Sequence, residues 1–508
     1  MNNFTFHNPT RLLFGKGMIE KLSTAIPMVH RIMITFGGGS VKQNGVYDQV
    51  IKALKDRDYI EFWGIEPNPT IETLREAIQI AKGKQVDFLL AVGGGSVIDG
   101  TKLISAGIQY DGDPWELVQK GYYYHTVPMG TVLTLPATGS EMNSGAVISR
   151  KETQEKFPFY SNFPVFSILD PETTFSLPPY QVSCGIADTF VHVMEQYMTT
   201  TDQSRLMDHW AESILSTLVE IAPKIKEDPR NYDLMADFML SATMGLNGFI
   251  AMGVTQDWAT HMIGHELTAL HGLTHGATLA IVFPGTLRTL RKQKEGKILQ
   301  YGERVWGINS GTTEERVSQA IEKTEQFFQS LGLSTRLSQE KIGDTTITEI
   351  ENRFNERNAA FGEAKNVTGS VAREILEGQM HQLQDTLTQI ALHHIDSFRH
   401  QELVHMAFLR QHRFALDQVP GIMLAQDPQD DLVMLLGIFR PMHDSPVGDR
   451  IFLELLQKRV QMAVGVKLDL RGQLSQPLPL GKRMAHLIPF GTYHPKRMVV
   501  PSLILLIL

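Results

Sequence analysis

Short apolar runs alternate with helix-like patterns over the first third of the chain. Arg31–Phe36 and Asp87–Val92 have the length of strands, are apolar almost throughout, and end in glycine clusters. Continuous runs of this kind predict strands that are buried on both faces of a sheet. Helical patterns follow them at Val46–Leu54 and Ile98–Ile108. The order of strand, glycine turn and helix predicts a parallel sheet flanked by helices, in a domain spanning residues 1–183.

The pattern changes from about residue 184 to residue 380. Apolar residues recur at the three- and four-residue spacing of helices in Ser204–Ile225, Leu234–Ile250 and Val317–Leu331. The pair Pro178–Pro179 precedes this region, and proline does not continue the interior of a strand or helix. We therefore predict an all-helical second domain over residues 184–380.

Residues 381–508 differ from both regions in composition. They hold half of the chain's histidines and only two glutamates, and several prolines interrupt any period. Three interpretations remain open: a fused module of unknown structure, an irregular extension that binds a partner, and sequence read past the usual stop or out of frame. None of them supplies a chemical motif.

Composition and charge narrow the class of protein. The chain has 508 residues, a formal net charge of -8 and 42% hydrophobic residues, which is ordinary for a globular protein. No basic region suggests a nucleic-acid partner, and no apolar stretch reaches the ~18 residues of a membrane helix. Cys184 is the sole cysteine, so no intramolecular disulfide can form. These features predict a cytoplasmic protein with neither a nucleic-acid nor a membrane partner.

Two glycine clusters follow the two predicted strands, at Gly37–Ser40 and Gly93–Ser96. Glycines such as Gly94 and Gly95 let the backbone approach a ligand closely. The following helix would direct its free N–H groups at a pyrophosphate, with Ser96 capping the helix or donating to a phosphate oxygen. One cluster alone is equally well a tight turn. Two at equivalent points of successive units predict a dinucleotide site, although the usual Rossmann glycine fingerprint is absent.

The first glycine turn also predicts which nicotinamide cofactor binds. An acidic residue at the end of a strand normally holds the ribose hydroxyls of NAD and repels a 2′-phosphate. This turn offers Gly38, Gly39 and Ser40, with Lys42 nearby and no carboxylate. Space, a hydroxyl group and a cation favour NADPH over NADH, unless another residue discriminates between the two.

Carboxylate and imidazole groups gather in the helical region. Asp188 and His192 stand four residues apart and would share one helix face. Four histidines follow within one segment, and Gly272 would end the helix that carries the first of them; they are His261, His265, His271 and His275. Each alone could be a hydrogen-bonded core or surface residue. Together they predict a site for one divalent metal, Fe²⁺ or Zn²⁺, and more plausibly a catalytic than a structural one. Spacing does not select the ligands.

At these motifs the chain resembles the iron-containing alcohol dehydrogenase superfamily, and within it the NADPH-dependent aldehyde reductase and butanol dehydrogenase branch. The similarity covers roughly residues 1–380. It rests on six segments that occur in the family's order: FGGGSVKQNGV, GIEPNPTIETL, LAVGGGSVIDGTK, LTLPATGSEMNSGAVIS, GIADTFVHVMEQY and QDWATHMIGHELTALHGLTHGATLAIVFP.

The resemblance implies the dehydroquinate synthase-like alcohol dehydrogenase architecture, with the active site between an α/β dinucleotide-binding domain and a helical metal domain. It implies that Asp188, His192, His261 and His275 bind the metal, and that His265 lies beside the nicotinamide. Homodimers or larger assemblies are common in the family. The cofactor residues that it implies are Ser40, Asn68, Gly95, Ser96, Asp99, Thr134, Thr138 and Lys156.

The sequence thus predicts an enzyme that transfers hydride between NADPH and small aldehydes or primary alcohols, mainly as an aldehyde reductase. The metal would polarise the aldehyde oxygen, and we expect His265 to help deliver a proton to the alkoxide. Two alternatives are an NADH-dependent polyol or diol dehydrogenase of the same superfamily and a catalytically silent relative whose tail binds a partner. The physiological aldehyde, the metal and the oligomeric state are left open.

Overall fold

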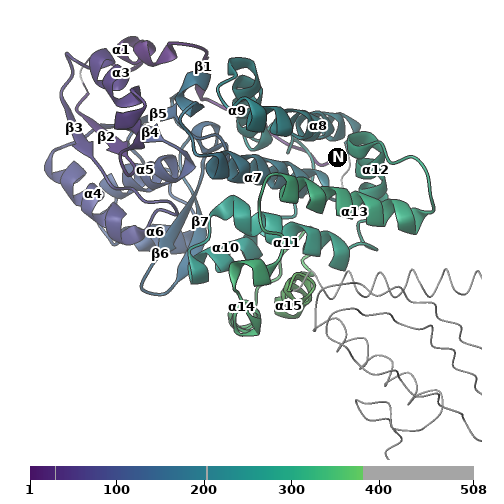
Figure 1. Ribbon diagram of the computed structural model, residues 1–508. Coiled ribbons are helices and arrows are strands. Elements are labelled where there is room, and N and C mark those ends of the chain that lie inside the picture. Colours follow the sequence, from purple (N-terminus) through teal and green to yellow (C-terminus); the bar gives the residue numbers. More distant parts are fainter. Residues whose placement is uncertain (29, 202–203, 381–508) are drawn as a thin grey trace, which may run out of the picture. The chain divides into compact units, whose positions relative to one another are not determined.

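The computed structural model describes residues 1–28, 30–201 and 204–380 (Figure 1). The predictions for residues 381–508 lie outside this range. A parallel six-stranded sheet occupies the first part of the chain, in the order β1-β8-β5-β4-β2-β3. Its strands are β1 (Arg11–Phe14), β2 (Ile32–Phe36), β3 (Tyr59–Phe62), β4 (Phe88–Gly93), β5 (Met129–Leu133) and β8 (Phe166–Leu169).

The predicted strands are confirmed as β2 and β4, which pair directly with Ile32 opposite Phe88. Both faces of β4 are buried, which explains why its sequence is apolar without alternation. Leu89 and Ala91 contact the helices of one face, and Leu90 contacts those of the other. One face is covered by α4 (Ile71–Gly83), α5 (Gly95–Ile108) and α6 (Pro114–Lys120). The other is covered by η1 (Met18–Lys21), α1 (Leu22–Ala25), α2 (Ser40–Gln43) and α3 (Val46–Ala53).

A separate antiparallel hairpin between β5 and β8 was not predicted. It consists of β6 (Gly145–Arg150) and β7 (Glu155–Tyr160), with Ser149 opposite Lys156. The hairpin packs on α5 and α6 and also contacts α10 (Ala259–His271). It is therefore one of the parts of the α/β region that contact the helical region. Two short 3₁₀ helices flank it, η2 (Ser140–Met142) and η3 (Pro171–Thr174).

The second region is helical, as predicted, and begins with α7 (Pro179–Tyr197). A proline fits the first turn of this helix because the N–H that it lacks has no partner there. The predicted helix Leu234–Ile250 is shorter, since α9 (Tyr232–Gly245) ends before Gly248, which has a positive φ. The other helices are α8 (Arg205–Glu227), α11 (His275–Thr289), α12 (Glu295–Trp306), α13 (Thr313–Ser330), η4 (Leu337–Glu340), α14 (Asp344–Glu356) and α15 (Gly369–Glu377).

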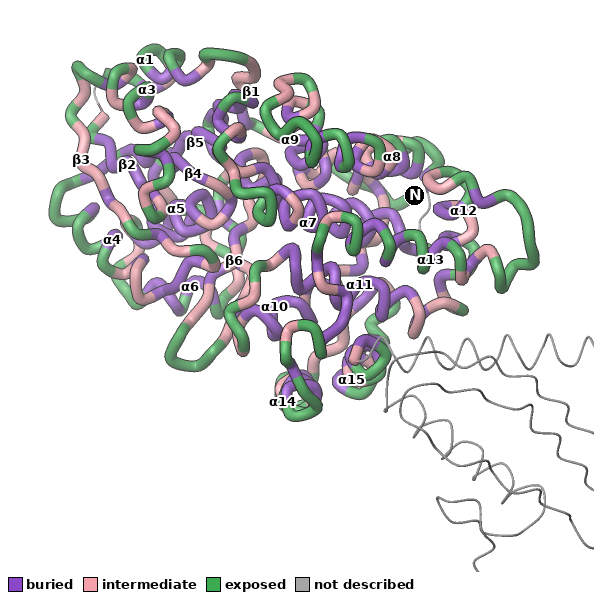
Figure 2. The backbone as a smooth tube through the Cα atoms, in the orientation of Figure 1, coloured by how far each residue is buried: buried purple, intermediate pink, exposed green. Residues whose placement is uncertain are grey.

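Helix α7 lies at the centre of the helical region and is buried along most of its length (Figure 2). Its apolar side chains share a core with α8, α9, α11, α12 and α13. The contact with α11 is especially close, because a Cβ at Gly276 would lie 2.1 Å from the carbonyl oxygen of Cys184. No helix in the described ranges has the length and apolarity needed to cross a membrane.

We predict that Gly276→Ala lowers the free energy of unfolding by about 1–3 kcal/mol, because the added methyl group must push α11 away from α7. Gly296 in α12 provides the control, since a Cβ there meets no atom within 4 Å. Gly296→Ala should change stability by at most about 1 kcal/mol, and in the stabilising direction. Urea unfolding followed by circular dichroism measures both. Equal midpoints for the two variants would contradict the close-contact argument.

Candidate functional site

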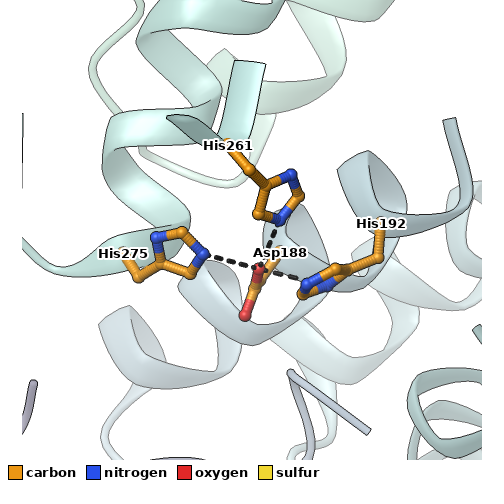
Figure 3. A group of neighbouring side chains, drawn as sticks. All are labelled: Asp188, His192, His261 and His275. Carbon is orange, nitrogen blue, oxygen red and sulfur yellow. Dashed lines mark ion pairs between the residues drawn. The ribbon is translucent and has the colours of Figure 1, made fainter. Parts of the chain in front are cut away.

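Three helices bring together one carboxylate and three imidazoles. Asp188 and His192 lie one turn apart on α7, as their spacing predicts, and His261 lies on α10. Gly272 ends α10 with a φ of 70°, also as predicted, so the chain turns and α11 begins at His275. The four side chains point toward one another (Figure 3).

The geometry of this group suits a metal ion. Asp188 Oδ1 lies 3.2 Å from His192 Nδ1, 3.8 Å from His261 Nε2 and 3.6 Å from His275 Nε2. One candidate ligand atom from each of the four residues lies within 4.8 Å of the others. Within the described ranges, Asp188 Oδ1, His192 Nδ1 and His261 Nε2 have no hydrogen-bond partner although they are buried. Buried polar atoms are seldom left without a partner, and a divalent cation at their centre would satisfy them.

Glu195 contacts His261 on the side of the ring that faces away from Asp188, and it was not predicted from the sequence. Its Oε2 is hydrogen-bonded to His261 Nδ1 and accepts the backbone N–H of His261 at 3.2 Å, while Oε1 accepts that of Thr260 at 2.7 Å. The carboxylate therefore holds the first turn of α10 and directs His261 Nε2 toward Asp188. Its spacing could have indicated this role, because Glu195 follows His192 by three residues and so lies on the same helix face.

Burial has the largest effect on the pKa values of the histidines. It lowers the pKa of His192 to about 4 and those of His265 and His275 well below the usual value. Burial also acts to lower the pKa of His261, but Glu195 and Asp188 outweigh it and raise that pKa to about 9. Neutral imidazole is the form that binds metals, so two of the three rings in the group, His192 and His275, already favour it.

His265 and His271 fall in different surroundings. The ring centre of His265 lies 5.2 Å from that of His275 and 6.3 Å from that of His261. His265 thus adjoins the group, and its buried Nδ1 has no hydrogen-bond partner among the described residues. His271 Nε2 instead lies 2.9 Å from the hydroxyl group of Thr346, as expected for a structural residue.

Trp258 is a second residue that the sequence analysis missed. It precedes α10 with a φ of 65°, which is uncommon for a bulky residue. Its ring lies 5.2 Å from His261 and 6.1 Å from His192, centre to centre, with both pairs near the edge-to-face arrangement. This half-buried indole therefore packs directly against two rings of the group. No sequence signal indicates a tryptophan in this conformation.

The second glycine turn lies at the carboxyl ends of β4 and β5, where ligands of parallel sheets bind. A Cβ at Gly95 would lie 2.4 Å from the Thr138 hydroxyl oxygen, and one at Gly94 would lie 3.0 Å from Leu135 Cβ. The prediction that Ser96 caps the helix is wrong, because α5 already begins at Gly95 and Gly94 is its N-cap. The Ser96 hydroxyl group instead accepts the backbone N–H of Asn68 at 3.3 Å.

Other predicted cofactor residues surround this turn. Lys156 Nζ donates to Asn68 Oδ1 at 2.9 Å, and the N–H of Thr134 donates to the carbonyl oxygen of Gly93 at 3.0 Å. Asp99 is buried, and its carboxylate accepts the Ser140 hydroxyl group at 2.5 Å and the Val147 N–H at 2.9 Å. Asp99 thus ties α5 to the loop and hairpin that border the turn.

The first glycine turn ends β2, next to β4 in the sheet. Gly39 has a φ of 103°, which favours glycine, and a Cβ at Gly38 would meet no atom within 4 Å. Gly38 and Ser40 are both exposed. Lys42, expected to face a phosphate, has its ammonium group 4.0 Å from the centre of the Trp63 ring. The turn therefore offers open backbone and a hydroxyl group.

Lys156 connects the nucleotide-side residues to the histidine group. Burial lowers its pKa to about 8, against the opposing effect of Asp188 and Asp99. Its charge in turn helps to lower the pKa values of His265 and His275, after burial. The Lys156 charge therefore acts on the histidine group as well as on its hydrogen-bond partner Asn68.

Comparison with known proteins places the chain in a family. A model described as iron-containing alcohol dehydrogenase matches residues 9–171, and a model of the C-terminal part of the Fe-containing alcohol dehydrogenase family matches residues 182–380. Together these ranges include the glycine turns, the hairpin and the whole group of histidines.

Several relatives match over nearly their full length. The NADPH-dependent aldehyde reductase YqhD of Escherichia coli K12 is 51% identical over 384 residues, which covers 74% of this chain and 99% of the relative. The NADP-dependent alcohol dehydrogenase 3 of Entamoeba histolytica is 43% identical and covers 70% and 93%. The crystal structure of NADH-dependent butanol dehydrogenase A from Thermotoga maritima is 34% identical, with a TM-score of 0.72 and coverage of 75% and 99%.

We predict that Glu195→Gln weakens metal binding by roughly 10- to 100-fold, because the amide cannot accept both backbone N–H groups and the imidazole equally well. Competition of Zn²⁺ between the protein and a chromophoric chelator measures this affinity without an activity assay. Glu212→Gln is the control, since this buried carboxylate on α8 accepts from Tyr197 and Gln300 instead. Equal affinity in the two variants would contradict the role given to Glu195.

Proposed function

The chain belongs to the iron-containing alcohol dehydrogenase family, and from this premise we propose that it reduces small aldehydes to primary alcohols with NADPH. The observation that carries this proposal is the convergence of Asp188 and three histidines into one group. A metal ligand set next to a dinucleotide turn provides both requirements of hydride transfer to a carbonyl group, namely an electrophile for oxygen and a place for the hydride donor.

We propose NADPH as the preferred cofactor. The first glycine turn supports this, because Gly38 and Ser40 are exposed and present no carboxylate to a 2′-phosphate. Lys42 contributes less than the sequence suggested, since Trp63 holds its ammonium group. The relatives include NADPH-, NADP- and NADH-dependent enzymes by name, so the turn itself is the stronger argument against an NADH-dependent polyol dehydrogenase.

The metal ligands that we propose are Asp188, His192, His261 and His275. One carboxylate and three imidazoles suit Fe²⁺ and Zn²⁺ alike, and the unpartnered buried atoms described above fit either ion. Thiolates, which structural zinc sites often use, are absent from this set. A catalytic role is therefore the better interpretation.

The metal would polarise the aldehyde oxygen and NADPH would supply the hydride. The chain's own residues then have distinct tasks. Asn68 and Lys156 would orient the cofactor, and Glu195 holds His261 in its ligand orientation. Burial lowers the pKa of His265 well below its usual value, which favours the neutral ring. We propose that it assists proton delivery to the alkoxide by passing on a proton from solvent or from a hydroxyl group of the cofactor.

We also propose that the enzyme acts in the cytoplasm as a homodimer. The single cysteine, Cys184, supports a reducing compartment. The strand β1 supports self-association, because it is an edge strand whose only neighbour in the described sheet is β8. Exposed edges of this kind commonly pair or are covered.

The proposal predicts that the full chain oxidises NADPH when given butanal, and that a chelator stops the reaction until Fe²⁺ or Zn²⁺ is restored. Asp188→Ala should abolish turnover through loss of bound metal, measured by elemental analysis. Asp233→Ala, an exposed carboxylate on α9, should change neither quantity. Turnover that persists in metal-free protein would refute the metal-dependent mechanism.

A second prediction concerns the choice of cofactor. Gly38→Asp should raise the KM for NADPH by roughly tenfold or more, since a carboxylate near the 2′-phosphate costs at least about 1.4 kcal/mol. The side chain has room, because no atom lies within 4 Å of its Cβ position. Gly38→Asn controls for size, and the KM for NADH should rise less in either variant. If Gly38→Asp affects both cofactors equally, the 2′-phosphate lies elsewhere.

A further inference from the structure

A buried carboxylate next to His265 pairs with two arginines, Arg353 in α14 and Arg357 at the C-cap of that helix. Glu266 follows His265 on α10, and its side chain is only 6% exposed. Arg353 Nη1 donates to Glu266 Oε2 at 3.1 Å, and Arg357 Nη1 donates to Glu266 Oε1. A carboxylate as deeply buried as this one needs such compensation. A single arginine can pair with both oxygens of a carboxylate. The Glu266 carboxylate therefore does not need two arginines for its own compensation.

The same arginines also reach the hairpin of the α/β region. Arg353 Nη1 donates to the carbonyl oxygen of Gln154 in the hairpin turn at 2.7 Å. The guanidinium group of Arg357 lies 5.1 Å from the centre of the Phe157 ring, and its Nη2 lies 3.9 Å from Glu155 Oε1. Arg353 and Arg357 therefore bridge α10 and β7, two elements that come from different halves of the chain.

The residues held by this bridge alternate with residues of the candidate site. On β7, Glu155 and Phe157 both contact Arg357, so Lys156 between them points to the opposite face of the strand. That face lies toward Asn68, to which Lys156 donates at 2.9 Å. On α10, Glu266 points to α14 while the preceding His265 points to the other histidines. The arginines thus contact the sequence neighbours of Lys156 and His265, two residues that point toward the candidate site. These neighbours are Glu155, Phe157 and Glu266.

We propose that Arg353 and Arg357 are positioning residues, which fix the β6–β7 hairpin against α10 and thereby place Lys156 for binding of the nicotinamide cofactor. The inference rests on the proposed function, since it takes Lys156 and Asn68 as cofactor residues. Release of the bridge frees the hairpin to shift relative to α10. Cofactor affinity then falls, whereas the metal ligands keep their positions on α7, α10 and α11.

Arg357→Gln tests the bridge, because Arg357 is half-buried and contacts both sides of it. The measurements are the Kd for NADPH from its fluorescence, the KM for NADPH, kcat, bound metal and the urea midpoint. We expect the Kd and KM for NADPH to rise roughly tenfold, with metal content unchanged. Arg357→Lys, which retains the charge beside Glu266, should recover part of the affinity.

Arg373→Gln is the matched control. Arg373 pairs with Glu351 at 3.1 Å and Glu377 at 3.0 Å, so it joins α14 to α15 and does not contact the hairpin. Arg373→Gln should change the urea midpoint about as much as Arg357→Gln does, but it should leave the Kd for NADPH unchanged. If Arg357 had a purely structural role, Arg357→Gln would lower the urea midpoint and leave the Kd for NADPH unchanged.

A double-mutant cycle with Phe157→Leu tests the bridge from the hairpin side. The two changes should each raise the Kd for NADPH and should be less than additive together, because both release the same contact. If Arg357→Gln fails to fold, Phe157→Leu and Arg357→Lys carry the test. An unchanged Kd for NADPH in these variants overturns this inference and leaves the proposed function intact. Failure of the unaltered protein to bind NADPH overturns the proposed function and the inference with it.

Discussion

The structure depends on the position of one buried carboxylate. Asp188 lies on the central helix α7, and one of its oxygens faces three imidazole rings without a hydrogen-bond partner in the described part of the chain. Burying a charge in this way is unfavourable unless a cation or hydrogen bonds compensate it. The arrangement of α7, α10 and α11 is what provides that compensation, either through the imidazoles or through the metal that they can hold together.

This requirement accounts for several local features of the helical region. Gly276 allows α11 to approach α7 closely enough for His275 to reach Asp188. Gly272 ends α10 and lets the chain turn within three residues. Glu195 binds the start of α10 through two backbone N–H groups and the ring of His261. Metal binding at this group would therefore be coupled to helix packing, because the residues that position the proposed ligands also hold the helices together.

The glycine turns proposed to bind the nucleotide come from the other half of the chain, and the hairpin is one of the elements through which that half contacts the helices of the histidine group. Lys156 links the two sides electrostatically, since it donates to Asn68 and its charge helps to lower the pKa values of His265 and His275. Its place depends on which face of β7 it occupies, and the register of the hairpin sets that face. Catalytic geometry of this kind depends on residues beyond the reacting groups, because small displacements are costly for hydride transfer.

The sequence by itself determined the features that depend on local periodicity. Continuous apolar runs predicted β2 and β4, the four-residue spacing of Asp188 and His192 placed them on one helix face, and Gly272 marked the end of α10. The glycine turns and the family motifs also predicted residues that lie close together in the structure, such as Asp188 with three histidines and Lys156 with Asn68. These signals are readable because they concern neighbours along the chain.

Tertiary structure alone decided which distant groups meet. It separated His271 from the other histidines, brought Glu195 behind His261, and made Ser96 a partner of Asn68 instead of a helix cap. It also inserted an antiparallel hairpin that brings Lys156 to Asn68. Spacing along the chain could not reveal these contacts, because each joins segments whose separation in sequence is unrelated to their distance after the helices and the sheet have packed.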